Sequence, residues 1–180
     1  EGVTVHTFEM PKMGTYGPMR KLFIAAEPMI TREGAILPRY GHGPYKRGLN
    51  KGFQRFLTSI DSPIVHTVQG YGIHEIGTAR PIGENAIISQ RGLAGNQDGI
   101  DQLLPVLARA GIEEVHFAGL PYIEDSFEAS GHFHIDGALG ILDEGLGIVH
   151  PQGLDYDTKR YLSKKGIELI EIPPEEQKQY

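Results

Sequence analysis

The chain has 180 residues, 17 Lys and Arg against 23 Asp and Glu, a formal net charge of -6 and no Cys. This length suits a single domain with its own hydrophobic core, and the acidic balance argues against binding to nucleic acid or to an anionic membrane, since both attract basic surfaces. Without Cys, a disulfide scaffold, a thiolate metal site and thiol chemistry carried out by these residues alone are excluded.

Four segments of similar sequence predict short strands along the chain. Each follows a turn residue or a helix-stopping residue, and together they cover residues 2–8, 62–68, 111–117 and 166–172. Further strand candidates stand ahead of each expected helix and end in the apolar residues 35–37, 86–88 and 147–149. The strands therefore recur at intervals of about one supersecondary unit.

Apolar residues at helical spacing predict helices between these strands. One stripe runs from Leu49 to Ile60, another runs from Ile100 to Leu107, and a third helix is expected before the last strand. Residues suited to an N-cap or to a left-handed stop after the helix flank the last two helices: Asn96, Gly111, Asp157 and Gly166.

The repeating unit is therefore strand, strand, helix, strand. Three such units are nearly complete, and the chain opens on the last strand of another. Because each unit must bury its sheet against neighbours, a closed ring of units needs more chain than 180 residues. We expect residues 1–180 to form a single α/β-propeller domain of about three and a half units, incomplete at both ends, from a longer or split protein.

The His-x-His-x-Asp sequence at residues 132–136 is the most informative for chemistry. In an extended strand His132, His134 and Asp136 share one face. Three interpretations stand: an exposed polar strand edge, a zinc site without an evident fourth ligand, or an acid/base pair in which His134 carries a proton and a carboxylate binds a substrate cation. The surrounding sequence favours the acid/base pair.

Residues 131–175, GHFHIDGALGILDEGLGIVHPQGLDYDTKRYLSKKGIELIEIPPEE, resemble the His-x-Asp region of the guanidino-group-modifying superfamily. This superfamily includes arginine deiminases, dimethylarginine dimethylaminohydrolases and amidinotransferases. Its fold is a five-bladed α/β propeller, or pentein, of strand-strand-helix-strand units, which agrees with the repeat described above. The resemblance implies an enzyme of arginine metabolism located in the cytoplasm.

Two upstream segments extend the resemblance. Residues 23–39 are similar to the family's Thr-Arg-Asp-Pro strand and the strand after it, so that Glu27 would replace the Asp that holds the substrate's guanidinium. Residues 74–78 are similar to the Glu-Gly-Gly-Asp strand, in which Glu75 would supply a second carboxylate. Arg47, in a basic-Arg-Gly run, would bind the substrate's carboxylate.

The resemblance implies a reaction through a Cys thiouronium intermediate. Carboxylates would hold the planar guanidinium, a thiolate would attack its carbon, and His134 would protonate the departing amine and then activate water. The expected catalytic residues are Glu75, His134 and Asp136, and the expected substrate-binding residues are Glu27 and Arg47. The Cys is expected outside these 180 residues, in the rest of the protein or in a second chain.

Alternatives stay open at this point. Water always competes for such an intermediate, which favours hydrolysis over transfer of the amidino group to an amine acceptor. A propeller module that binds the cation without turnover, and a metal-dependent hydrolase built on residues 132–136, represent other classes. We expect a small guanidino substrate, no metal or cofactor, and no nucleic-acid or membrane partner, and we leave a homo-oligomer open. His6, His66 and His116 recur on the terminal strands, which indicates packing rather than catalysis.

Overall fold

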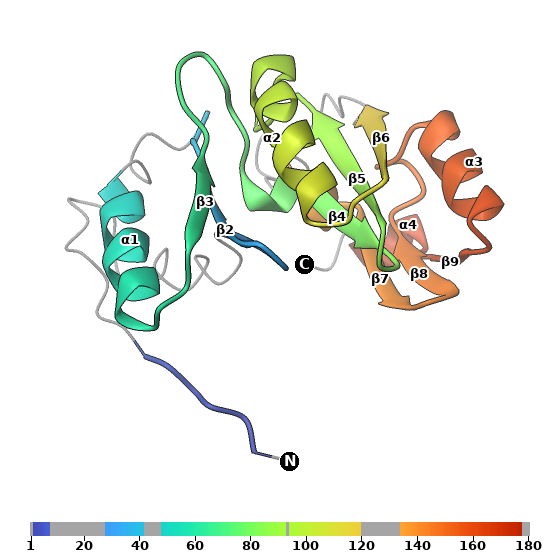
Figure 1. Ribbon diagram of the computed structural model, residues 1–180. Helices are drawn as coiled ribbons and strands as arrows, with labels where there is room; N and C mark the ends of the chain where they lie inside the picture. The colour runs from blue at the N-terminus through green and yellow to red at the C-terminus, as the bar shows by residue number, and fades with distance from the viewer. Residues whose placement is uncertain (1, 8–27, 42–47, 93, 120–133, 178–180) are drawn as a thin grey trace.

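Three strand-strand-helix-strand units follow one another along the chain. The computed structural model describes residues 2–7, 28–41, 48–92, 94–119 and 134–177. Figure 1 shows the units side by side in chain order, each with a small sheet and a helix beside it. The predicted α/β architecture is confirmed for these three units.

The bounds of the elements follow the predicted pattern. The first unit contains β1 (Met29–Thr31), β2 (Gly34–Leu37), α1 (Leu49–Ser59) and β3 (Ile64–Thr67). The second contains β4 (Ala79–Ile82), β5 (Ala86–Arg91), α2 (Gln97–Arg109) and β6 (Glu114–Gly119). The third contains β7 (Leu139–Asp143), β8 (Leu146–Val149), α3 (Tyr156–Lys164) and β9 (Glu168–Glu171), followed by the short α4 (Pro174–Gln177).

Every sheet has the same pairing. The middle strand runs antiparallel to the first strand and parallel to the third. A parallel pair needs a crossover connection, and the helix of the unit supplies it. The first strand of each unit therefore starts at the sheet end where the helix also starts, and the loops that carry the site lie there.

The helix ends confirm three of the four predicted cap residues. Asn96 caps α2 by accepting a hydrogen bond from the Gly99 N–H, and Gly111 and Gly166 have left-handed φ angles of 89° and 76°. The Asp157 prediction is wrong, because Asp155 is the N-cap of α3 and accepts from the Thr158 N–H. Asp155 has the extended backbone that a cap requires, whereas Asp157 lies in the first turn of the helix.

Residues 2–7 differ from the prediction, because they form no strand. A strand is stabilised by hydrogen bonds to a neighbouring strand, and none of the described strands pairs with this segment. The half unit expected at the amino end is therefore absent from the part of the chain that the structure describes. His6 nevertheless contacts the first unit, with its ring centroid 6.5 Å from that of Phe56 on α1.

The recurring histidines mark contacts from one unit to the helix of the next. His66 Nε2 on β3 lies 3.3 Å from the Gln102 Oε1 of α2, and His116 Nε2 on β6 lies 3.1 Å from the Thr158 Oγ1 of α3. The His116 ring also stacks on Tyr161 of α3 at 4.2 Å. The predicted packing role is thus confirmed.

Two clusters of apolar side chains hold the units together. One lies between the first and second units and includes Met29, Val68, Ala79, Ile87 and Leu103. The other lies between the second and third units and includes Ile82, Ile88, Ile135, Leu139 and Leu162. Because neighbouring residues of β5 enter opposite clusters, the second sheet is buried on both faces and fixes the relative position of the units.

Candidate active site

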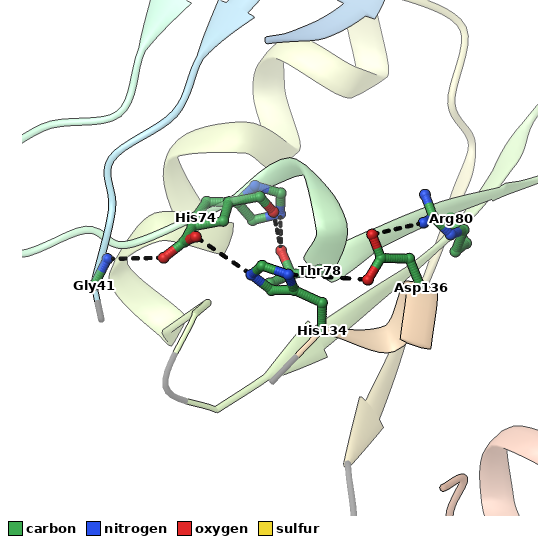
Figure 2. A network of polar contacts seen from close by, with 7 residues as sticks. Gly41, His74, Thr78, Arg80, His134 and Asp136 are labelled. Carbon is green, nitrogen blue, oxygen red and sulfur yellow. Dashed lines mark hydrogen bonds and ion pairs between the residues drawn. The ribbon is translucent and has the colours of Figure 1, made fainter. Parts of the chain in front are cut away.

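Two equivalent turns meet where the second unit faces the third. A 3₁₀ turn, η3 (Ile76–Thr78), precedes β4, and another, η5 (Ile135–Gly137), precedes β7. Glu75 and His134 occupy the same position before these turns, with extended backbones at φ -106° and φ -127°. The repeat therefore places a carboxylate and an imidazole side by side (Figure 2).

Glu75 is completely buried, at 0% exposure. Its Oε1 accepts a hydrogen bond of 3.1 Å from the Gly41 N–H, and its Oε2 lies 3.3 Å from His134 Nε2. Its own N–H donates to the Ala94 carbonyl at 3.0 Å. A buried carboxylate needs such partners to offset its loss of hydration, so its position is tightly determined.

His134 and Asp136 continue the network towards the third unit. His134 Nδ1 lies 3.9 Å from Asp136 Oδ1, and Asp136 Oδ2 is paired with Arg80 Nη2 at 3.0 Å. The side chains of His134, Asp136 and Arg80 are 21%, 30% and 26% exposed. His134 therefore stands between two carboxylates and remains accessible from solvent, as a group that exchanges protons with a substrate must.

Gly77 is the residue that lets these side chains approach. A Cβ atom on Gly77 would lie 2.7 Å from His134 Cγ and Nδ1 and 2.9 Å from Asp136 Oδ2. These distances are well inside van der Waals contact, so no other residue fits without moving the imidazole or the carboxylate.

A second imidazole lies behind Glu75. Burial lowers the pKa of His74 from 6.5 to about 4, although the charge of Glu75 acts in the opposite direction, so His74 is neutral at pH 7. The Thr78 hydroxyl donates to the Glu75 carbonyl at 2.5 Å and therefore accepts from His74 Nε2, which lies 3.2 Å away. His74 and Thr78 fix the backbone of Glu75 and add no charge to the site.

Three of the five predicted site residues come together, namely Glu75, His134 and Asp136. Glu27 and Arg47, like His132, lie outside the described residues. The prediction of an extended strand through residues 132–136 is wrong for residues 134–136, the described part, because a 3₁₀ turn begins at Ile135. The turn still brings His134 and Asp136 to one side, since residue 135 points into the core with 0% exposure.

Arg80, Gly77 and His74 also belong to the site, and the sequence patterns did not predict them. A signal for Arg80 is present, since it is a single charged residue within the otherwise uncharged β4. Gly77 and His74 depend on contacts between units, which a linear pattern does not reveal.

Neither a metal cluster nor a membrane helix is found in the described ranges. No group of three or more His, Cys, Asp and Glu residues in these ranges could hold a metal ion. Likewise, no helix there is long and apolar enough to cross a bilayer.

The three units have the fold of known guanidino-group-modifying enzymes, and the predicted resemblance to them is confirmed at the level of the fold. The chain is similar to the DDAH of Pseudomonas aeruginosa complexed with citrulline, with a TM-score of 0.68, 19% identity, and 86% of this chain and 54% of that chain covered. It is also similar to the N-terminal domain of ArgZ bound to product, an arginine dihydrolase of the ornithine-ammonia cycle in cyanobacteria. That similarity has a TM-score of 0.69 at 17% identity and covers 87% of this chain and 54% of that chain.

A curated relative is named for a reaction on a different compound, 2-nitroimidazole. The chain is 28% identical over 187 residues to the 2-nitroimidazole nitrohydrolase of Mycobacterium sp. (strain JS330). The alignment covers 99% of this chain. The chain spans about half of that relative, 49% of its length. No protein-family model matches the chain.

Proposed function

We propose that the protein containing this chain is a hydrolase that acts at a planar carbon flanked by nitrogens, as in a guanidino group. The observation that carries the proposal is the convergence of Glu75, His134 and Asp136 from two neighbouring units, with the imidazole 3.3 Å from one carboxylate and 3.9 Å from the other. The similarities to DDAH, ArgZ and the nitrohydrolase support it.

The compounds in the names of these relatives share one chemical feature. The guanidino carbon of arginine and carbon 2 of 2-nitroimidazole are both planar and flanked by nitrogens. Displacement at such a carbon requires the nitrogens to be held in plane while a group leaves. Carboxylates suit the N–H groups of the substrate, and an imidazole suits transfer of a proton to the leaving group or from water.

In the mechanism that we propose, the nucleophile is a Cys thiolate outside these 180 residues, which contain no Cys. With a guanidino substrate, the thiolate adds to the substrate carbon, and the leaving amine departs with a proton from His134. His134 then takes a proton from the water that attacks the thiouronium carbon. The carbon–sulfur bond breaks, and the thiolate is restored. Glu27 and Asp136 are proposed to bind the substrate, and Glu75 to orient His134.

Substitution of the two central residues tests this function in the full-length protein. His134→Asn and Glu75→Gln remove the proton carrier and its buried partner, so we expect kcat to fall by about 100-fold or more in each variant. Citrulline formation from arginine and dimethylarginine and nitrite release from 2-nitroimidazole are the measurements.

Glu84→Gln provides the matched control, because the Glu84 side chain is 89% exposed and pairs with Arg32, which is not part of the network. Its kcat should equal that of the wild type. Wild-type kcat in His134→Asn would remove His134 from the mechanism. If the wild-type protein releases no product from any of the three substrates, the proposed function is wrong.

A further inference from the structure

The position of Arg80 is set by the alternation of side chains along β4. Ala79 packs in the cluster towards the first unit, whereas Ile82 packs in the cluster towards the third unit. Alternate residues of a strand share a face, so Arg80 points with Ile82 towards the third unit and reaches Asp136 there. The Arg80–Asp136 ion pair is therefore built into the contact between two units.

This pair changes the charge that a substrate meets. Arg80 is held in place by a second hydrogen bond, which its Nη1 donates to the Ala79 carbonyl at 3.2 Å. Burial lowers its pKa below the ordinary value, yet a guanidinium stays protonated in proteins. The charge of Asp136 is therefore matched by that of Arg80.

We propose that Arg80 determines substrate specificity, because its pairing with Asp136 disfavours guanidinium cations and favours uncharged planar ligands with nitrogens beside the reacting carbon. This inference rests on the proposed function and names the substrate class of that same site. The contact that carries it is the 3.0 Å pair between Arg80 Nη2 and Asp136 Oδ2.

The physical reason is competition for one carboxylate. A guanidinium substrate must displace Arg80 from Asp136 or bind beside a like charge, and either choice costs free energy. An uncharged azole needs only hydrogen bonds to the Asp136 carboxylate and the His134 imidazole. The Arg80–Asp136 pair stays intact when such a ligand binds. The name of the curated relative, a nitrohydrolase of 2-nitroimidazole, is consistent with this class.

Binding to full-length variants tests the inference with two probes at a mildly acidic pH, 2-nitroimidazole as the uncharged ligand with its ring N–H protonated and N-methylguanidinium as the cation. Isothermal titration calorimetry on the wild type should show tighter binding of 2-nitroimidazole. In Arg80→Gln, Asp136 is released, and we expect the affinity for N-methylguanidinium to rise by about tenfold or more relative to that for 2-nitroimidazole. Arg80→Lys keeps the charge and should keep the wild-type preference.

Arg160→Gln is the matched control, since Arg160 is exposed on α3. Its binding ratio should not change, and thermal melting checks that every variant is folded. An unchanged ratio in Arg80→Gln, or tighter binding of N-methylguanidinium than of 2-nitroimidazole by the wild type, overturns the inference while leaving hydrolysis intact. Failure of the proposed function appears separately, as an absence of turnover in a wild type that still shows the binding preference.

Discussion

Glu75 carries a carboxylate into the interior of the protein, where a charge without partners would be very unfavourable. The Gly41 N–H and His134 surround its two oxygens at 3.1 and 3.3 Å. Such contacts leave the carboxylate little freedom to rotate. His134 consequently meets a fixed partner on one side and a solvent-accessible carboxylate, Asp136, on the other.

Gly77 gives a direct test of how closely the network is packed. In Gly77→Ala the new methyl group would overlap His134 and Asp136, at 2.7 and 2.9 Å, and must displace one of them. We expect kcat to fall by about 100-fold, since a shift of about 1 Å in a catalytic group has this effect. Steady-state kinetics of the full-length protein measure the effect.

Gly145→Ala is the control for that substitution. Gly145 lies in the turn between β7 and β8, and the nearest atom to its Cβ would be at 3.7 Å, an ordinary contact. Its kcat should match the wild type. Unchanged kcat in Gly77→Ala would show that the network tolerates movement.

The buried His74 makes stability depend on pH. The unfolded chain takes up a proton below its ordinary pKa of 6.5, but folded His74 stays neutral until its pKa of about 4. The free energy of unfolding therefore falls as pH drops through this window, by about 3 kcal/mol in total. Urea unfolding at about pH 7.5 and at about pH 4, on either side of most of the titration, measures the loss. A His74→Gln variant lacks the titrating group, and an equally steep pH dependence in that variant would contradict the assignment.

At the scale of elements, Asn96 joins a helix to the loop that leads to Glu75. Its Oδ1 accepts from the Gly99 N–H at 2.9 Å, which caps α2, and from the Ile73 N–H at 2.8 Å. Its Nδ2 donates to the Tyr71 carbonyl at 2.8 Å. One side chain thus fixes both the start of α2 and the path of residues 71–73.

Asn96→Ala should therefore affect stability and activity together. We expect the free energy of unfolding to fall by about 2 kcal/mol, through loss of the cap and of the loop contacts, and kcat to fall because the segment that holds Glu75 loosens. Asp155→Ala removes the cap of α3. The Asp155 carboxylate binds Gly119 and Thr158 and does not contact Glu75 or His134. It should lose similar stability and keep its kcat. Equal losses of kcat in the two variants would contradict this distinction.

Elements could be predicted where local rules decide their ends. The spacing of apolar residues indicates α1 and α2 correctly, and Gly111 and Gly166 stop helices because each has a left-handed φ. The turn at residues 135–137 could not be predicted, because it depends on the packing of Ile135 in an apolar cluster with side chains of the second unit. The alternation of residues predicts which side chains share a face of a strand. It does not predict which residues of another unit a turn contacts.

At the scale of the whole molecule, the units depend on one another for both core and site. The two apolar clusters lie between units, and the acid/base network crosses the same contact as the second cluster. The order of the units and the pairing of His134 with Asp136 could be predicted from sequence. Arg80 could not be assigned a partner, because its contact arises only when β4 and η5 are packed together.

The equivalence of the two turns keeps the geometry of the site constant. Glu75 and His134 stand at the same place in consecutive copies of one unit, with nearly the same backbone conformation. The distance between Glu75 and His134 is therefore set by the packing of one unit against the next, and not by the conformation of a separate loop. The repeat of the unit provides the spacing, and the different side chains at the two equivalent positions, a carboxylate and an imidazole, have different roles.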